Sequence, residues 1–356
     1  MATARAAGEW ATGGGLHGIG DSLYTPFCGT DGDDIDWEAY RTLVRYCVGD
    51  LHHDMLWLTS GVGEWWSLTM DERKQLLEVA VLAARAVAPD TVIQACTSAA
   101  SAKDCVELTQ HAQEHGADIC FLQTPPMEVH AGEGVLRFFQ YVADRTDIAL
   151  GMFNSPSSGC VLSAQEMAAI HHQVPAVVAV KEGVMDSTSR TTALHALAPD
   201  LVIWECDLIV YSAGWLQQGI VGPAQLGTAA YLFETPDNLA YRRYWELIWD
   251  GHLAEAARYS KESGLDDRSA GMGSWLVQYP GRSEYFTHWG EAFKYAASVM
   301  GLPVGDFPYS RPPQGRLPEV AKTQIRSARD GWGGGQGRSR SRDGRRLRRQ
   351  TEEPAD

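Results

Sequence analysis

The sequence predicts an α/β fold, a (β/α)8 TIM barrel with additional C-terminal helices. Short apolar or β-branched runs alternate with longer segments of helical periodicity, as in a chain of β-α units. Eight such runs can be counted, and eight parallel strands, each followed by a helix, close into a barrel of about 250 residues. The chain has 356 residues, which leaves room for helices after the barrel.

The predicted strands are all short and rich in apolar side chains. They cover residues 17–25, 54–59, 91–96, 118–123, 148–153, 176–181, 201–205 and 219–225. Between them, Thr69 and Glu72 form a capping box ahead of an apolar stripe at helical spacing, made of Leu76, Ala80, Ala83 and Val87. Further helices are expected over 101–115, 133–146, 163–172, 186–197, 208–218 and 235–250, with more in 252–300. In such a barrel the functional groups lie at the carboxyl ends of the strands and in the loops that follow.

The composition changes at both ends of the chain. The first residues are rich in Ala, Gly and Thr, and the last contain GWGGGQG followed by an Arg-rich run. Neither end carries enough apolar surface to offset the entropy lost on ordering. We expect a disordered leader over 1–15, the barrel over 16–250, a helical extension over 251–318 and a disordered Arg-rich tail over 319–356.

The charge balance argues against nucleic-acid binding by the folded body. Thirty Lys and Arg face 45 Asp and Glu, and because residues 319–356 hold ten basic and six acidic side chains, the first 318 residues carry −19. Such a surface repels phosphate backbones. Seven cysteines without a C-x-x-C pair indicate reduced thiols, and no run of 18 apolar residues occurs. We expect a cytoplasmic protein that does not associate with membranes.

Lys181 is the most informative single residue, because it ends the apolar segment AVVAVKEG. An ammonium group at the end of a buried strand loses hydration, which favours the neutral amine that attacks a carbonyl carbon. The alternative is a lysine paired with an acid such as Glu182 or Asp207.

Several other segments at predicted strand ends share one pattern with Lys181. They are Thr25-Pro26-Phe27, Gly63-Glu64, Ser67-Leu68-Thr69, Phe153-Asn154-Ser155-Pro156, Lys181-Glu182-Gly183 and Gly219-Ile220-Val221-Gly222. Over residues 17–313 this ordered set resembles the dihydrodipicolinate synthase and N-acetylneuraminate lyase superfamily of class I aldolases and dehydratases. The resemblance implies that Lys181 forms a Schiff base with the ketone of a 2-oxo acid, and that the protonated imine accepts electrons while a neighbouring bond forms or breaks. It implies no metal and no cofactor.

The resemblance also implies which residues surround the amine. The family's Gly-Thr-Thr-Gly-Glu, which holds the substrate carboxylate, is Ser60-Gly61-Val62-Gly63-Glu64 here, so the backbone N–H groups of Gly61 and Val62 and the Ser60 hydroxyl take its place. The family's proton-carrying tyrosine is replaced by Phe153, which leaves Tyr24, Ser155, Glu182 or water as candidates for proton transfer. The remaining expected substrate contacts are Thr25, Phe153, Asn154, Glu182, Asp207, Gly222 and Gln225.

Other departures concern the reaction type. The synthase's substrate-binding arginine is replaced by Ser158 and its aromatic pair by Pro126-Met127, so dihydrodipicolinate synthase activity is not expected. The segment Glu64-Trp65-Trp66-Ser67-Leu68-Thr69 is similar to one in the 5-dehydro-4-deoxyglucarate dehydratase branch. Trp65 and Trp66 fit a packing role as well as substrate contacts. Twelve Trp in all would suit a bulky aromatic substrate, as in the family's hydratase-aldolases.

Two weaker patterns have simpler explanations. Gly13-x-Gly15-x-x-Gly18 matches a dinucleotide fingerprint by letter, but it precedes the first strand instead of following one. His111 and His115 lie four positions apart on a predicted helix, and without a third ligand at sensible spacing we interpret them as a solvated helix face.

The sequence therefore predicts a Schiff-base-forming lyase, an aldolase or a dehydratase, whose partner is a small carbonyl substrate. One alternative is a biosynthetic condensing or decarboxylating enzyme for an unusual aromatic substrate. Another is a non-catalytic barrel that binds a carbonyl ligand. The resemblance also implies a homo-oligomer, either a dimer or a tetramer.

Overall fold

The computed structural model describes residues 8–125, 132–155, 160–183, 188–205, 224–225, 230–265, 276–278, 285–287 and 289–330. Asp207, Gly222, Pro126-Met127, Ser158 and the helix expected over 208–218 lie outside these residues.

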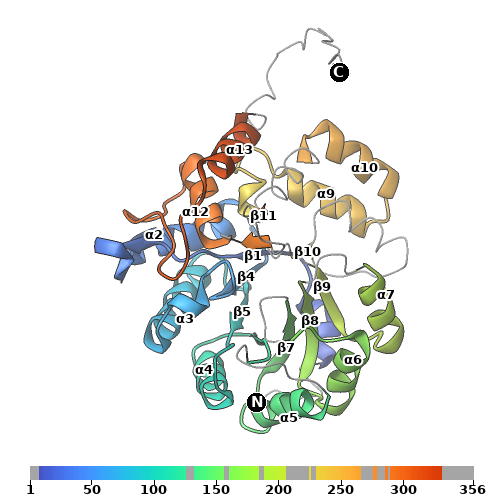
Figure 1. Ribbon diagram of the computed structural model, residues 1–356. Helices are drawn as coiled ribbons and strands as arrows, with labels where there is room; N and C mark the ends of the chain where they lie inside the picture. Colours follow the sequence, from blue (N-terminus) through green and yellow to red (C-terminus); the bar gives the residue numbers. More distant parts are fainter. Residues whose placement is uncertain are drawn as a thin grey trace, which may run out of the picture.

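A single sheet of eight parallel strands forms the centre of the protein (Figure 1). Its spatial order is β10-β1-β4-β5-β6-β7-β8-β9, and β9 also lies against β10, so the sheet closes into the predicted barrel. Each strand coincides with a predicted apolar run. The strands are β1 (Ile19–Ser22), β4 (Met55–Leu58), β5 (Val92–Cys96), β6 (Ile119–Leu122), β7 (Ala149–Asn154), β8 (Val177–Glu182), β9 (Val202–Glu205) and β10 (Ala224–Gln225).

Helices surround the sheet on its outer side (Figure 1). They are α2 (Trp37–Arg45), α3 (Met70–Arg85), α4 (Ala102–Glu114), α5 (Glu133–Ala143), α6 (Ala164–Gln173), α7 (Thr188–Leu197) and α9 (Ala240–Trp249). The capping box of Thr69 and Glu72 is present at the start of α3. Val87 was wrongly placed in the buried stripe of this helix, because α3 ends at Arg85 and the Val87 side chain is 48% exposed.

The C-terminal part adds the helices α10 (Leu253–Glu262), α12 (Trp289–Val299) and α13 (Glu319–Asp330). Two short antiparallel pairs complete the described elements: β2 (Phe27–Cys28) with β3 (Asp34–Ile35), and β11 (Leu276–Gln278) with β12 (Tyr285–Thr287). Among the described helices, none is both long and apolar enough to cross a bilayer.

Two apolar cores lie on the two faces of the sheet, because successive side chains of a strand alternate in direction. The outer core joins the sheet to the helices and is the larger one. The inner core fills the barrel with side chains such as Met55, Trp57, Ile119, Phe121, Phe153 and Trp204. Gly151 makes room inside for Phe121, since a Cβ at this glycine would lie 2.3 Å from the ring.

Part of each terminal segment that the sequence predicted to be disordered is helical in the described residues. Residues 8–15 are helical, and Ala11 and Leu16 are buried in the inner core. The helix α13 occupies the first part of the expected tail, where Ala321 and Ile325 are buried in the outer core. Each segment carries a few apolar side chains that meet a core already built by the barrel, which is sufficient to offset the ordering entropy.

Two ionic contacts fasten the C-terminal extension to the barrel. Lys294 on α12 forms a fully buried ion pair with Glu64, with Nζ 2.6 Å from Oε1, and also donates to the carbonyl of Tyr309 at 2.9 Å. Arg311 contacts Glu72 at the start of α3, with Nη2 2.8 Å from Oε1. The same guanidinium donates to the carbonyl of Asp33 at 2.9 Å. The extension therefore covers the side of the barrel where β4 runs into α3.

Candidate active site

Lys181 lies inside the barrel, close to the carboxyl end of β8. Lys181 lies two positions after Ala179, so its side chain points to the same inner face of the strand, and it is only 5% exposed. The Nζ atom sits 4.5 Å from the ring centroid of Trp57 and 4.5 Å from that of Phe153. Among the described residues, no carboxylate and no hydrogen-bond acceptor pairs with this nitrogen. The described residues thus leave the amine available for chemistry.

Aromatic rings form the surroundings of the amine. Trp57 meets Phe153 edge to face with centroids 4.9 Å apart, and Phe121 contacts Trp57 at 5.7 Å and Trp204 at 4.7 Å. The faces of such rings attract a cation, whether an ammonium or an iminium ion. The indole N–H groups of Trp57 and Trp204 are buried and find no acceptor within the described part of the chain. They are donors available to water or to an oxygen atom of a ligand.

Trp57 and Trp204 were not predicted as neighbours of Lys181, although Trp57 lies under its amine and Trp204 is its register partner on β9. Side chains of a strand alternate between its two faces, so Trp57 in Met55-Leu56-Trp57-Leu58 points away from the face that carries Leu56 and Leu58. That pattern does not say which face of the strand points into the barrel, so the assignment needed the closed sheet.

Asn154 and Glu182 lie on the outer side of the sheet, away from the amine. Asn154 donates from Nδ2 to Oε2 of Glu182 at 2.9 Å and accepts at Oδ1 from the backbone N–H of Leu162 at 2.8 Å. Arg190 on α7 completes the group, with Nε 3.6 Å from Oε2 of Glu182. These two predicted substrate contacts therefore tie the ends of β7 and β8 to the surrounding loops, and Glu182 does not pair with Lys181.

The loop after β4 is held by hydroxyl groups. The Oγ atoms of Ser22 and Ser60 are 2.6 Å apart, and Thr25 donates to the carbonyl of Gly63 at 2.8 Å. The backbone N–H groups of Gly61 and Val62 have no acceptor among the described residues. Thr25 and Ser60 thus shape the turn, and the two free amides are the part of it suited to bind a carboxylate.

Tyr24 is engaged elsewhere in the structure. Its hydroxyl donates to the carbonyl of Pro303 at 2.8 Å, and its ring packs edge-on against Tyr231 with centroids 6.0 Å apart. Complete burial, with a smaller contribution from Cys47, raises the pKa of the Tyr24 phenol well above its usual value. Tyr24 therefore anchors the C-terminal segment, and this position argues against it as the proton carrier.

Two further predicted site residues are placed by the backbone. Ser155 directly follows β7 and is half-buried, so it remains at the carboxyl end of the barrel. Gln225 pairs in register with Gly20 at the start of β1. Asp207 and Gly222 lie outside the described residues.

A second buried polar group joins three parts of the fold. His53, which precedes β4, contacts Asp21 of β1 through Nδ1, and its Nε2 lies 2.5 Å from Oε2 of Glu234. Burial by itself would lower the pKa of His53, but the charges and hydrogen bonds of the two carboxylates outweigh it and raise the pKa to about 9. His53 is therefore an imidazolium held between two carboxylates, and its role is structural.

Comparison with known proteins identifies the family to which this fold belongs. The sequence model of the dihydrodipicolinate synthetase family matches residues 16–262, which is more than half of the chain. A 4-hydroxy-tetrahydrodipicolinate synthase from Thermotoga neapolitana is 29% identical over 193 residues, covering 53% of this chain and 63% of that protein. The chain thus spans less than two thirds of the length of this curated relative.

Solved structures agree on the fold. A prophage protein of the dihydrodipicolinic acid synthase family from E. coli K12, in complex with pyruvate, has a TM-score of 0.73 at 21% identity, covering 89% of this chain and 98% of that one. The N-acetylneuraminate lyase from Fusobacterium nucleatum has a TM-score of 0.72 at 16% identity, covering 90% and 99%. With the family match, the closed barrel and the inward-facing Lys181, the conclusion is that this chain belongs to the dihydrodipicolinate synthetase family.

Proposed function

We propose that this protein is a class I lyase, an aldolase or a dehydratase, in which Lys181 forms a Schiff base with a 2-oxo acid. Members of its superfamily are Schiff-base-forming lyases. The observation that carries the proposal is the position of Nζ inside the barrel, over the rings of Trp57 and Phe153 and without an acid partner among the described residues.

The surroundings of the amine suit each step of that chemistry. The neutral amine adds to the ketone carbon, and loss of water gives an imine whose protonated form is a cation. The ring faces of Trp57 and Phe153 stabilise this cation without forming a bond to it. The iminium nitrogen then takes up the electron pair left when a bond at the neighbouring carbon breaks. The free N–H groups of Gly61 and Val62 are the proposed holders of the substrate carboxylate.

The aromatic interior supports a substrate other than that of dihydrodipicolinate synthase. Phe153 places a ring without a hydroxyl 4.5 Å from the amine, so no phenol can carry a proton at this position. We infer a bulky or aromatic carbonyl substrate and a relationship to the dehydratase or hydratase-aldolase branches. Ser155 or water is the proposed proton carrier. A cytoplasmic homo-oligomer, either a dimer or a tetramer, is part of the same proposal.

Borohydride trapping tests the imine directly. The full-length protein is incubated with pyruvate or with an aromatic 2-oxo acid, reduced, digested and analysed by mass spectrometry. We expect the reduced adduct on Lys181 and its loss in Lys181→Arg. Lys261→Arg, at an exposed position on α10, is the matched control and should leave the adduct unchanged. Absence of label on Lys181 with every compound of the panel would overturn the proposal.

Phe153 also favours a second candidate, a barrel that binds a carbonyl ligand without turning it over, because the family's proton-carrying phenol is absent. Product analysis separates the candidates once an adduct is found. A lyase cleaves or joins a carbon–carbon bond of the carbonyl substrate, or removes water from it. A decarboxylating enzyme releases carbon dioxide, and a binding barrel forms the adduct without any product.

A further inference from the structure

Two histidines and a glutamate meet on the outside of the barrel, between α3 and α4. Glu78 lies on α3, and His111 and His115 lie one turn apart on α4. One ligand atom of each lies within 4.8 Å of the other two. The sequence showed the histidine pair without a third ligand, and the packing of α3 against α4 supplies it.

The ring nitrogens are oriented for binding an ion. His115 Nδ1 is 2.8 Å from the carbonyl of His111, so Nδ1 carries the proton and Nε2 carries the lone pair. The Nε2 atom of His111 is buried and forms no hydrogen bond, although Oε1 of Glu78 is only 3.1 Å away. His115 Nε2 lies 3.9 Å from the same oxygen. Both free lone pairs therefore lie near one carboxylate oxygen.

The separation of His111 Nε2 from Glu78 Oε1 fits the coordination sphere of a small divalent ion, and that of His115 Nε2 from the same oxygen has to shorten by about 0.6 Å. Two ligands at the usual Zn–N and Zn–O distances and at a tetrahedral angle are about 3.3 Å apart. The two imidazole rings stack with centroids 3.9 Å apart and planes inclined by 22°, so at least one ring has to rotate about its side-chain torsions before both Nε2 atoms point at one ion. The side chains of Glu78 and His115 are 43% and 40% exposed, which leaves room for water to complete the coordination.

We propose that Glu78, His111 and His115 form a binding site for a divalent transition-metal ion of the Zn²⁺ type, which links α3 to α4. Imidazole ligands favour Zn²⁺, Co²⁺, Ni²⁺ and Cu²⁺ over Mg²⁺ and Ca²⁺. An ion pair of Glu78 with a protonated His111 is the competing arrangement.

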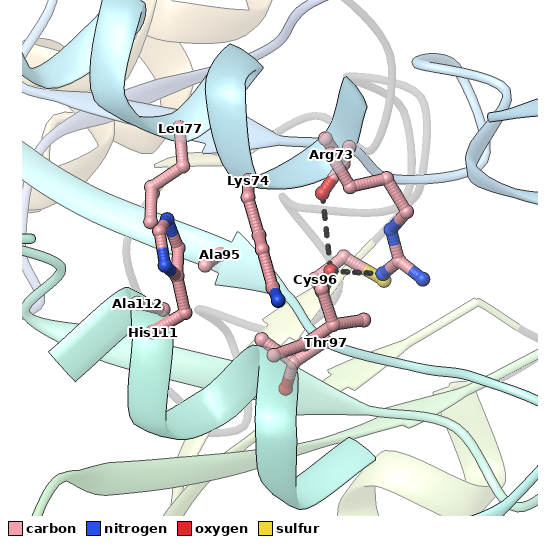
Figure 2. A pocket seen from close by; sticks show the side chains of 10 residues that line it. Arg73, Lys74, Leu77, Ala95, Cys96, Thr97, His111 and Ala112 are labelled. Carbon is pink, nitrogen blue, oxygen red and sulfur yellow. Dashed lines mark hydrogen bonds between the residues drawn. The ribbon is translucent and has the colours of Figure 1, made fainter. Parts of the chain in front are cut away.

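A hollow beside His111 gives the site freedom to adjust. It lies between α3 and α4 and is lined by Lys74, Leu77, His111 and Ala112, with Cys96 and Thr97 at the end of β5 (Figure 2). His111 projects from α4 towards Leu77 of α3 in this view. Because this hollow adjoins the imidazole of His111, the ring has space on one side to rotate towards the ion.

The test is a metal titration of the full-length, untagged protein after chelator treatment. Co²⁺ is added and its visible absorption is recorded, and Zn²⁺ is then used to displace it. We expect one ion per chain and at least about tenfold weaker binding in Glu78→Ala, His111→Ala and His115→Ala, since each removes one ligand. His172→Ala, an exposed histidine on α6, is the matched control and should bind as the wild type does.

A stability measurement gives an independent readout. Zn²⁺ should raise the thermal midpoint of the wild type and of His172→Ala but not that of His115→Ala, because a ligand stabilises only the state that binds it. His115 is a surface residue, so circular dichroism should show that its replacement leaves the fold intact. Equal affinities in the wild type and all three ligand variants, or no stoichiometric Co²⁺ binding, would overturn the proposal.

Discussion

His53 makes the stability of this protein depend on pH in a defined direction. Its pKa rises from 6.5 to about 9 in the folded state, because Asp21 and Glu234 outweigh the effect of burial. At 1.36 kcal/mol per pH unit this shift corresponds to about 3 kcal/mol of stabilisation. A raised folded-state pKa gives stability that is fully present below the unfolded pKa and is lost as the pH rises towards the folded pKa. The free energy of unfolding should therefore fall by about 2 kcal/mol between about pH 6.5 and 8.5.

Urea unfolding at several pH values in this window measures the effect. Glu234→Gln removes one of the two carboxylates while keeping a hydrogen-bonding side chain, so the pKa of His53 should drop and the pH dependence should become shallower. His172→Gln, on the surface of α6, is the control and should leave the slope unchanged. If the wild type and Glu234→Gln gave parallel plots of unfolding free energy against pH, the assignment of the slope to His53 would be wrong.

Three further changes test other parts of the fold. Lys294→Met leaves Glu64 buried without its cation and should lower the unfolding free energy by about 3–5 kcal/mol, measured by urea unfolding. Gly151→Ala places a Cβ 2.3 Å from the Phe121 ring and should cost about 1–3 kcal/mol, with a smaller near-ultraviolet dichroism signal; unchanged stability would contradict the packing described here. Thr69→Ala removes the cap of α3 and should lower the thermal midpoint by an amount equivalent to about 1 kcal/mol, whereas Thr69→Ser should not.

The strands were readable from the sequence because strands of a barrel covered by helices are buried on both faces. Such strands appear as continuous apolar runs, and all eight predicted runs coincide with strands of the sheet. Lys181 stood out for the same reason, since a charged side chain in an apolar run is rare. Its position inside the barrel agrees with the prediction of an amine at the carboxyl end of a strand.

The partners of individual side chains were not readable, because they come from distant parts of the chain. Tyr24 bonds to a carbonyl 279 positions away, and His53 to a carboxylate 181 positions away. Asn154 and Glu182 stand next to plausible catalytic positions in sequence, yet strand alternation turns them to the outer face. Local pattern gives the order of the elements, whereas the direction of a side chain and its distant partner depend on the closed sheet.

The helical segment over residues 8–15 has a practical consequence for anyone shortening this protein. Ala11 and Leu16 belong to the same buried cluster as Met55, Ile119 and Ala149, the first residues of their strands, so this segment closes the barrel at the end opposite Lys181. Trimming at residue 16, as the glycine-rich composition invites, would let water in beneath the aromatic rings under the amine. If borohydride trapping failed in such a trimmed protein, the cause would be water entering the barrel from this end. The chemistry of Lys181 should therefore be tested on a chain that keeps residues 8–16.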